Sequence, residues 1–103
     1  MHTIEAIALT PEKYIIKGDL IFSNINKASV KILNFKQSGS TMTIDLQQLG
    51  KIDSAGLALL IEWIKFSRKQ QIKLQFDNIP AQLTALAKLS YLSEIDLFTT
   101  KNT

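Results

Sequence analysis

The stretch KIDSAGLALLIEWI, residues 51–64, places an acid, a hydroxyl and a glycine directly before the most apolar segment of the chain. Aspartate and serine are preferred helix N-caps, because their side-chain oxygens accept otherwise unpaired backbone N–H groups. Asp53 or Ser54 therefore predicts the start of a helix that ends at about Gln70. The predicted inward stripe of this helix consists of Leu57, Leu60, Ile61, Ile64 and Phe66 or Ser67, with Trp63 off the stripe.

The four residues from Asp53 to Gly56 allow two interpretations. In the first, they only start a helix, and their small size lets the first turn lie close to a neighbouring strand. In the second, the Ser54 hydroxyl lies exposed beside unpaired N–H groups at the positive end of the helix dipole, where a phosphate is favoured. Ser54 is then a docking point for a partner or a candidate phosphorylation site.

The rest of the chain alternates between strand and helix patterns. Strands are predicted at 2–9, 14–20, 41–46, 72–76 and 94–98, with a turn at 10–13. A helix capped by Ser23 or Asn24 is predicted at 23–35. Another helix is predicted within 77–92, with Pro80 in its first turn and an inward face of Leu83, Leu86, Ala87 and Tyr91. Alternating strands and helices predict parallel strand pairs joined by crossovers. The expected fold class is α/β, with a central mixed β-sheet of four to five strands and helices packed against it.

Length and composition suit one domain over residues 1–103, with a frayed tail at 98–103. The chain has 46% apolar and 20% charged residues, no cysteine, and a single histidine at position 2. A thiolate or multi-histidine metal site is therefore not expected, and Ser54 has no histidine base to activate it as a nucleophile. We expect no catalytic residues, no metal and no cofactor.

The net charge of +3 comes from scattered lysines and arginines. The nearest approach to a basic cluster, Lys65, Arg68 and Lys69, suits the C-terminal end of a helix and lacks the aromatic residues of a nucleic-acid interface. We expect no signal peptide, because residues 1–14 lack a basic region followed by a long apolar run, and the apolar run at 57–61 is too short to cross a bilayer. The sequence predicts a cytoplasmic protein without nucleic-acid binding or direct membrane insertion.

Four segments together resemble the STAS domain, the fold of anti-sigma-factor antagonists. They are KGDL at 17–20, TIDL at 43–46, IDSAGLALL at 52–60 and KLQF at 73–76. The resemblance covers nearly the whole chain and implies a non-catalytic binding domain.

Within this family, DSAGLA at 53–58 and LTALAKLSYL at 83–92 resemble the STAS subunits of Mla-type phospholipid ABC transporters. Those subunits usually carry threonine where this chain has Ser54, so the hydroxyl is kept. The resemblance implies that the chain binds the cytoplasmic ATPase of such a transporter, supports outer-membrane lipid asymmetry, and lies peripherally at the inner membrane. The implied partner-binding residues are Asp53, Ser54, Ala55, Gly56 and Leu57.

The alternative is an anti-sigma-factor antagonist, whose partners are an anti-sigma factor and its serine kinase. That branch usually has Asp-Ser-(Ser/Thr)-Gly-Leu-Gly, with the serine phosphorylated, whereas this chain has Ala55 and Ala58. Trp63 is a candidate interface anchor, since aromatic residues often anchor interfaces, or else is buried under the helix predicted at 23–35. A third class, a small enzyme or ligand-binding domain, rests only on the polar groups near the helix start.

Overall fold

The computed structural model describes residues 3–35 and 39–89 of the chain. In order, the elements are β1 (Glu5–Thr10), β2 (Lys13–Leu20), the 3-10 helix η1 (Phe22–Asn24), α1 (Lys27–Val30), β3 (Thr41–Asp45), β4 (Leu49–Ile52), α2 (Ser54–Lys69), β5 (Lys73–Asp77) and α3 (Ala81–Leu89). The strand predicted at 94–98, the tail at 98–103 and Tyr91 lie outside the described residues.

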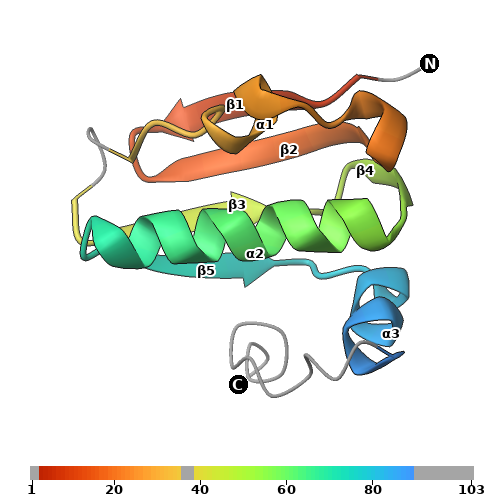
Figure 1. Ribbon diagram of the computed structural model, residues 1–103. Coiled ribbons are helices and arrows are strands. Elements are labelled where there is room, and N and C mark those ends of the chain that lie inside the picture. The colour runs from red at the N-terminus through yellow and green to blue at the C-terminus, as the bar shows by residue number, and fades with distance from the viewer. Residues whose placement is uncertain (1–2, 36–38, 90–103) are drawn as a thin grey trace.

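The five strands form one mixed sheet in the order β1-β2-β3-β5, with β4 paired to β2 beyond the end of β3 (Figure 1). The predicted hairpin is confirmed, because β1 and β2 pair antiparallel; their register shifts between Ala8 and Thr10, just before Pro11. The other pairs, β2 with β3, β2 with β4 and β3 with β5, are parallel. The predicted α/β class with a mixed sheet is therefore correct.

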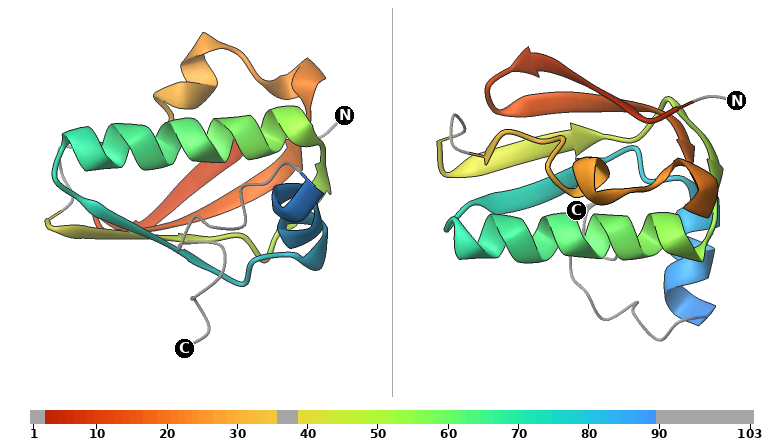
Figure 2. Two further views of the ribbon diagram at one scale, coloured as in Figure 1. Left: turned by 60° about the horizontal axis from the view of Figure 1, so that its bottom comes forward. Right: turned by 45° about the horizontal axis from the view of Figure 1, so that its top comes forward.

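One face of the sheet forms the floor of the core. Alternate residues of β2, β3 and β5 are buried, as expected for strands covered on one side; they are Tyr14, Ile16, Met42, Ile44, Leu74 and Phe76. Helices α1 and α2 lie on this side of the sheet, and α3 lies beyond its end, near the start of α2 (Figure 2). The start of α2, the exit of β2 and the start of α3 thus meet at one end of the molecule.

The helix predicted from Asp53 or Ser54 is confirmed as α2, with Asp53 as its N-cap. Arg68 and Lys69 lie in its last turn, where positive charge suits the dipole, and Gln71 takes a positive φ of 60° as the chain turns into β5. The buried residues of α2 are Gly56, Leu57, Leu59, Leu60, Trp63, Ile64 and Ser67. Trp63 thus belongs to the inward face, and its predicted position off that face is wrong.

The single helix predicted over 23–35 is also wrong. The Asn26 side chain accepts hydrogen bonds from the N–H groups of Ala28 and Ser29 and starts a separate four-residue helix, α1, while η1 precedes it. Beyond α1 the chain is irregular, and Leu33 and Phe35 are buried in the core. Helix propensity is a weak preference, and here capping by Asn26 and burial of two large side chains outweigh it.

Strand β4 was not predicted. Its four residues, LGKI, include a glycine and two exposed positions, so they carry no strand pattern. Pairing with Gly18 and Leu20 of β2 creates this strand, and the Asp19 Oδ1 accepts a hydrogen bond from the Lys51 N–H at 2.8 Å. Strand β4 is therefore formed by a contact with residues distant in the sequence, which no local pattern indicates.

The first turn of α2 lies directly against the end of β2. Gly56 is buried, and a Cβ atom there would meet the Leu20 carbonyl oxygen and lie 2.7 Å from the Leu20 Cβ. The small size of Gly56 therefore sets how closely the helix approaches the strand. This supports the interpretation in which small residues permit close packing.

We predict that Gly56→Ala lowers the free energy of unfolding by about 1–3 kcal/mol, since the added methyl group overpacks the helix–strand contact. Helix propensity alone predicts the opposite sign. Urea denaturation measures the change, and Gly39→Ala is the control, because a Cβ there meets only the end of the flexible Glu12 side chain. Equal stability of the Gly56→Ala variant and the native chain would contradict the packing argument.

Candidate functional site

Asp53 joins three segments at the start of α2. Its Oδ1 accepts hydrogen bonds from the N–H groups of Ala55 (2.9 Å) and Gly56 (3.2 Å), which caps the helix. Its Oδ2 accepts one from the Phe22 N–H at 3.0 Å, and its own N–H donates to the Leu20 carbonyl at 3.1 Å. Asp53 thereby fixes η1 against the helix through its carboxylate, and the end of β2 through its backbone N–H.

Further polar contacts hold the loops around this junction. The Asn24 side chain donates to the Asp19 carbonyl at 2.9 Å, which ties η1 to β2. From α3, the Gln82 side chain donates to the Ile52 carbonyl at 2.9 Å, directly before Asp53. The backbone around Ser54 is therefore held from both sides.

The five predicted contact residues differ in exposure. Ser54 is exposed at the first position of α2, and Asp53 and Ala55 are half-buried. Gly56 is buried, and Leu57 is only 2% exposed. Ser54 can therefore touch a partner directly, whereas Gly56 and Leu57 shape the site from within the core.

Two further residues complete the exposed surface: Phe22, which the sequence did not indicate, and Ala58, which belongs to the DSAGLA motif but was not among the predicted contact residues. Phe22 is 77% exposed, and its backbone N–H is hydrogen-bonded to Asp53, so this residue belongs to the segment beside the start of α2. Ala58 is exposed one turn after Ser54 on the same side of the helix. We call Phe22, Ser54 and Ala58 the α2 N-terminal surface. It combines an exposed aromatic ring, a hydroxyl and a small residue.

Trp63 does not belong to a surface. Its side chain is fully buried, and its indole N–H donates to the Ser29 carbonyl of α1 at 3.1 Å. Of the two alternatives for Trp63, the role of interface anchor is incompatible with this structure. The structure shows the other alternative, burial under the segment that follows β2. A buried indole needs a partner for its N–H, and α1 supplies it.

A second polar cluster lies where β3 and β5 end. The Asn78 side chain donates to Asp45 Oδ1 at 3.0 Å, as does the Gln47 N–H at 2.9 Å. These hydrogen bonds, with a smaller contribution from Lys13, lower the pKa of Asp45 below its ordinary value. The resulting stabilisation is present above that ordinary pKa and is lost as the pH falls through the lowered one.

The described residues contain no group of three or more histidine, cysteine or acidic side chains arranged to hold a metal ion. Within residues 3–35 and 39–89, no helix is long and apolar enough to cross a membrane.

The mixed sheet, the helices on one of its faces and the Asp53-capped start of α2 define a small α/β domain. A model of the STAS domain family matches residues 13–103, so the chain belongs to that family. STAS domains are in general non-catalytic regulatory or binding domains. A search of the curated proteins gave no match.

Among solved structures, the chain is similar to the anti-sigma factor antagonist SpoIIAA in its unphosphorylated form. The two share 16% sequence identity and a TM-score of 0.63, over 88% of this chain and 83% of the other. At this identity the match establishes the STAS fold alone.

We predict that Asp53→Ala destabilises the protein by about 1–2 kcal/mol, since the α2 cap and the contact with Phe22 are both lost. Asp53→Asn keeps an acceptor oxygen and serves as the matched control, with a smaller loss. Thermal unfolding followed by circular dichroism measures both. An Asp53→Ala variant as stable as Asp53→Asn would show that the cap does not hold this junction.

Proposed function

We propose that this chain is a non-catalytic docking subunit, and that the α2 N-terminal surface is where it binds a protein partner. The observation that carries the proposal is the exposed Ser54 at the first position of α2, with the small, exposed Ala58 one turn later and the exposed Phe22 in the segment that Asp53 ties to the helix. Exposed aromatic residues anchor many interfaces, and small neighbours let a partner approach closely.

The partner we propose is the cytoplasmic ATPase of an Mla-type phospholipid ABC transporter. The support is the sequence DSAGLA at 53–58, together with LTALAKLSYL at 83–92, which resembles the STAS subunits of those transporters. Ala58 is exposed and adds no bulk beside Ser54. In this role the chain supports assembly and activity of the transporter, and it lies at the inner membrane through the complex rather than by insertion.

We predict that Ser54→Arg abolishes binding of the partner, because a long cation replaces a small hydroxyl at the centre of the contact. Phe22→Ala weakens binding at least about tenfold, the loss typical of a central aromatic anchor. Binding is measured by pull-down from the native host followed by titration with the purified ATPase.

Ser40→Arg is the matched control, because Ser40 is also an exposed serine but precedes β3, at the end of that strand away from Asp53. Circular dichroism checks that each variant keeps the native spectrum. Full binding by a folded Ser54→Arg variant would contradict the proposal that the partner binds the α2 N-terminal surface. Recovery of neither ATPase nor permease by the native chain would argue against the transporter.

An anti-sigma-factor antagonist is the second candidate, favoured by the structural similarity to SpoIIAA. Ser54 is accessible at the N-terminal end of a 16-residue helix. A phosphate there would lie beside the helix N-terminus and would add close to two negative charges to the docking surface. Phosphorylation would then switch partner binding off or on without any change of fold.

For this candidate, we predict a species heavier by one phosphate in intact-mass spectra of the chain purified from its host under several growth conditions. Ser54→Ala removes that species, and Ser54→Asp abolishes binding of an anti-sigma factor. Absence of the heavier species under every condition, or its persistence in Ser54→Ala, would count against the antagonist.

A further inference from the structure

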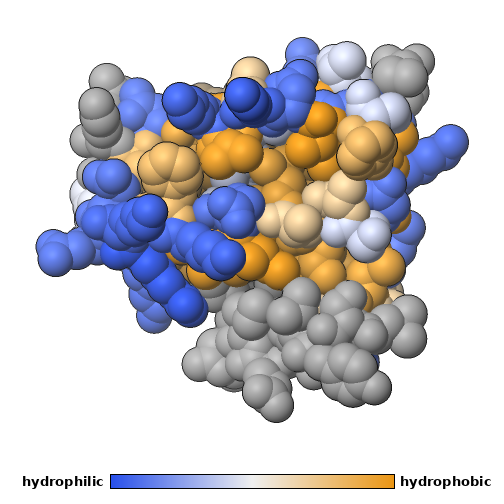
Figure 3. All heavy atoms as spheres, in the orientation of Figure 1, coloured by the Kyte–Doolittle hydropathy of each residue, from blue (hydrophilic) through white to orange (hydrophobic). Residues whose placement is uncertain are grey.

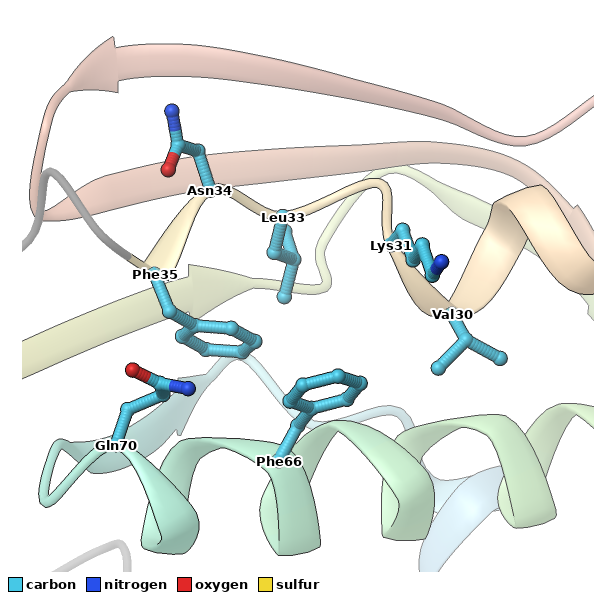
Figure 4. A pocket seen from close by; sticks show the side chains of 7 residues that line it. All are labelled: Val30, Lys31, Leu33, Asn34, Phe35, Phe66 and Gln70. Atoms are coloured by element: carbon cyan, nitrogen blue, oxygen red, sulfur yellow. The ribbon is translucent and has the colours of Figure 1, made fainter.

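A pocket of about 320 Å³ opens between α2 and the irregular segment that follows α1 (Figure 4). Its apolar lining is formed by Val30, Leu33, Phe35 and Phe66, and Lys31 and Gln70 bring polar groups to it. The pocket forms where the chain leaves the helical path after Val30 and residues 31–34 run without helix or strand.

The inner part of the pocket is aromatic. Phe35 descends from the irregular segment and Phe66 rises from α2, with ring centroids 6.2 Å apart and planes inclined by 20°. Val30 and Phe66 are half-buried, so apolar surface reaches the opening, and Figure 3 shows apolar residues gathered between the two helices on this face. A 150 Å³ apolar cavity holds a benzene molecule, so about 320 Å³ has room for one ring or a short chain.

The charge at the opening has one sign. Lys31 lies beside Val30, exposed, and the residues that line the pocket include no acid. Among the described residues, Lys65 and Glu62 form an ion pair, and Lys31 forms none, so its ammonium group is not neutralised by an acidic side chain. The pocket therefore offers an apolar interior and a positive charge at its mouth.

We propose that this pocket binds a small amphipathic carboxylate, with its short acyl chain or ring between Val30 and Phe66 and its carboxylate at Lys31. Ligand sites typically combine an apolar lining with a few placed polar groups, and here Lys31 selects the anionic head. The pocket is separate from the α2 N-terminal surface, since twelve residues of helix, about 18 Å, lie between Ser54 and Phe66.

Trp63 supplies a built-in reporter. It is the single tryptophan of the chain, it is buried, and its indole N–H is bound to the carbonyl of Ser29, the residue before Val30. Phe66 follows it by one turn of α2. A ligand in the pocket therefore changes the fluorescence of Trp63.

The experiment titrates the full chain with octanoate and with octanol, which share a chain length and differ in charge. Trp63 fluorescence and isothermal titration calorimetry measure both affinities. We expect saturable binding of octanoate, stronger than that of octanol by about three- to tenfold, the effect of one partly exposed ion pair. Non-saturable changes, or equal affinities for the two compounds, would overturn the proposal.

Lys31→Met removes the charge and keeps most of the side-chain length, so it should bring the octanoate affinity down to that of octanol. Lys27→Met is the control, because Lys27 is exposed one turn earlier in α1 and does not line the pocket. Should Lys31→Met not fold, the native chain still gives a test. Binding of octanoate should weaken as salt rises from 0.05 to 0.5 M, by about two- to fivefold, while octanol is unaffected. Salt-independent octanoate binding would contradict the role of Lys31.

Discussion

The structure depends on the way one residue, Asp53, joins the start of α2 to η1 and to the end of β2. One carboxylate oxygen caps the helix and the other accepts the Phe22 N–H, while the Asp53 N–H donates to Leu20. A neighbouring constraint, the absence of a Cβ at Gly56, sets the distance between α2 and the end of β2. The proposed α2 N-terminal surface depends on this junction, because Phe22 and Ser54 come from different segments and Asp53 hydrogen-bonds to the Phe22 backbone.

The sequence was most informative where local patterns and long-range packing agree. The strands at 41–46 and 72–76 and the helix from Asp53 to about Gln70 were predicted within one or two residues, because alternation or helical spacing coincides with burial there. The cap was predicted at Asp53 or Ser54 for the same reason, since a capping side chain bonds to the residues that follow it, and the structure assigns it to Asp53. Ser54 followed from its place beside that cap.

The predictions failed where distant residues decide the conformation. Residues 23–35 have apolar positions near helical spacing, but the Asn26 cap and the burial of Leu33 and Phe35 divide them. The predicted position of Trp63 off the inward face of α2 failed for the same reason. Its indole N–H donates to the Ser29 carbonyl, which lies within residues 23–35. Phe22 gained its role only through a bond to a residue 31 positions away, which no local pattern can indicate.

The shift of register in β1 bears on solubility. An edge strand presents unpaired backbone groups that can recruit strands from other molecules, and β1 also exposes Ile7 and Leu9. The irregularity between Ala8 and Thr10 bends this edge, and Pro11 directly after it offers no N–H. This exposed edge strand is thus a poor template for aggregation, although two of its apolar side chains face solvent.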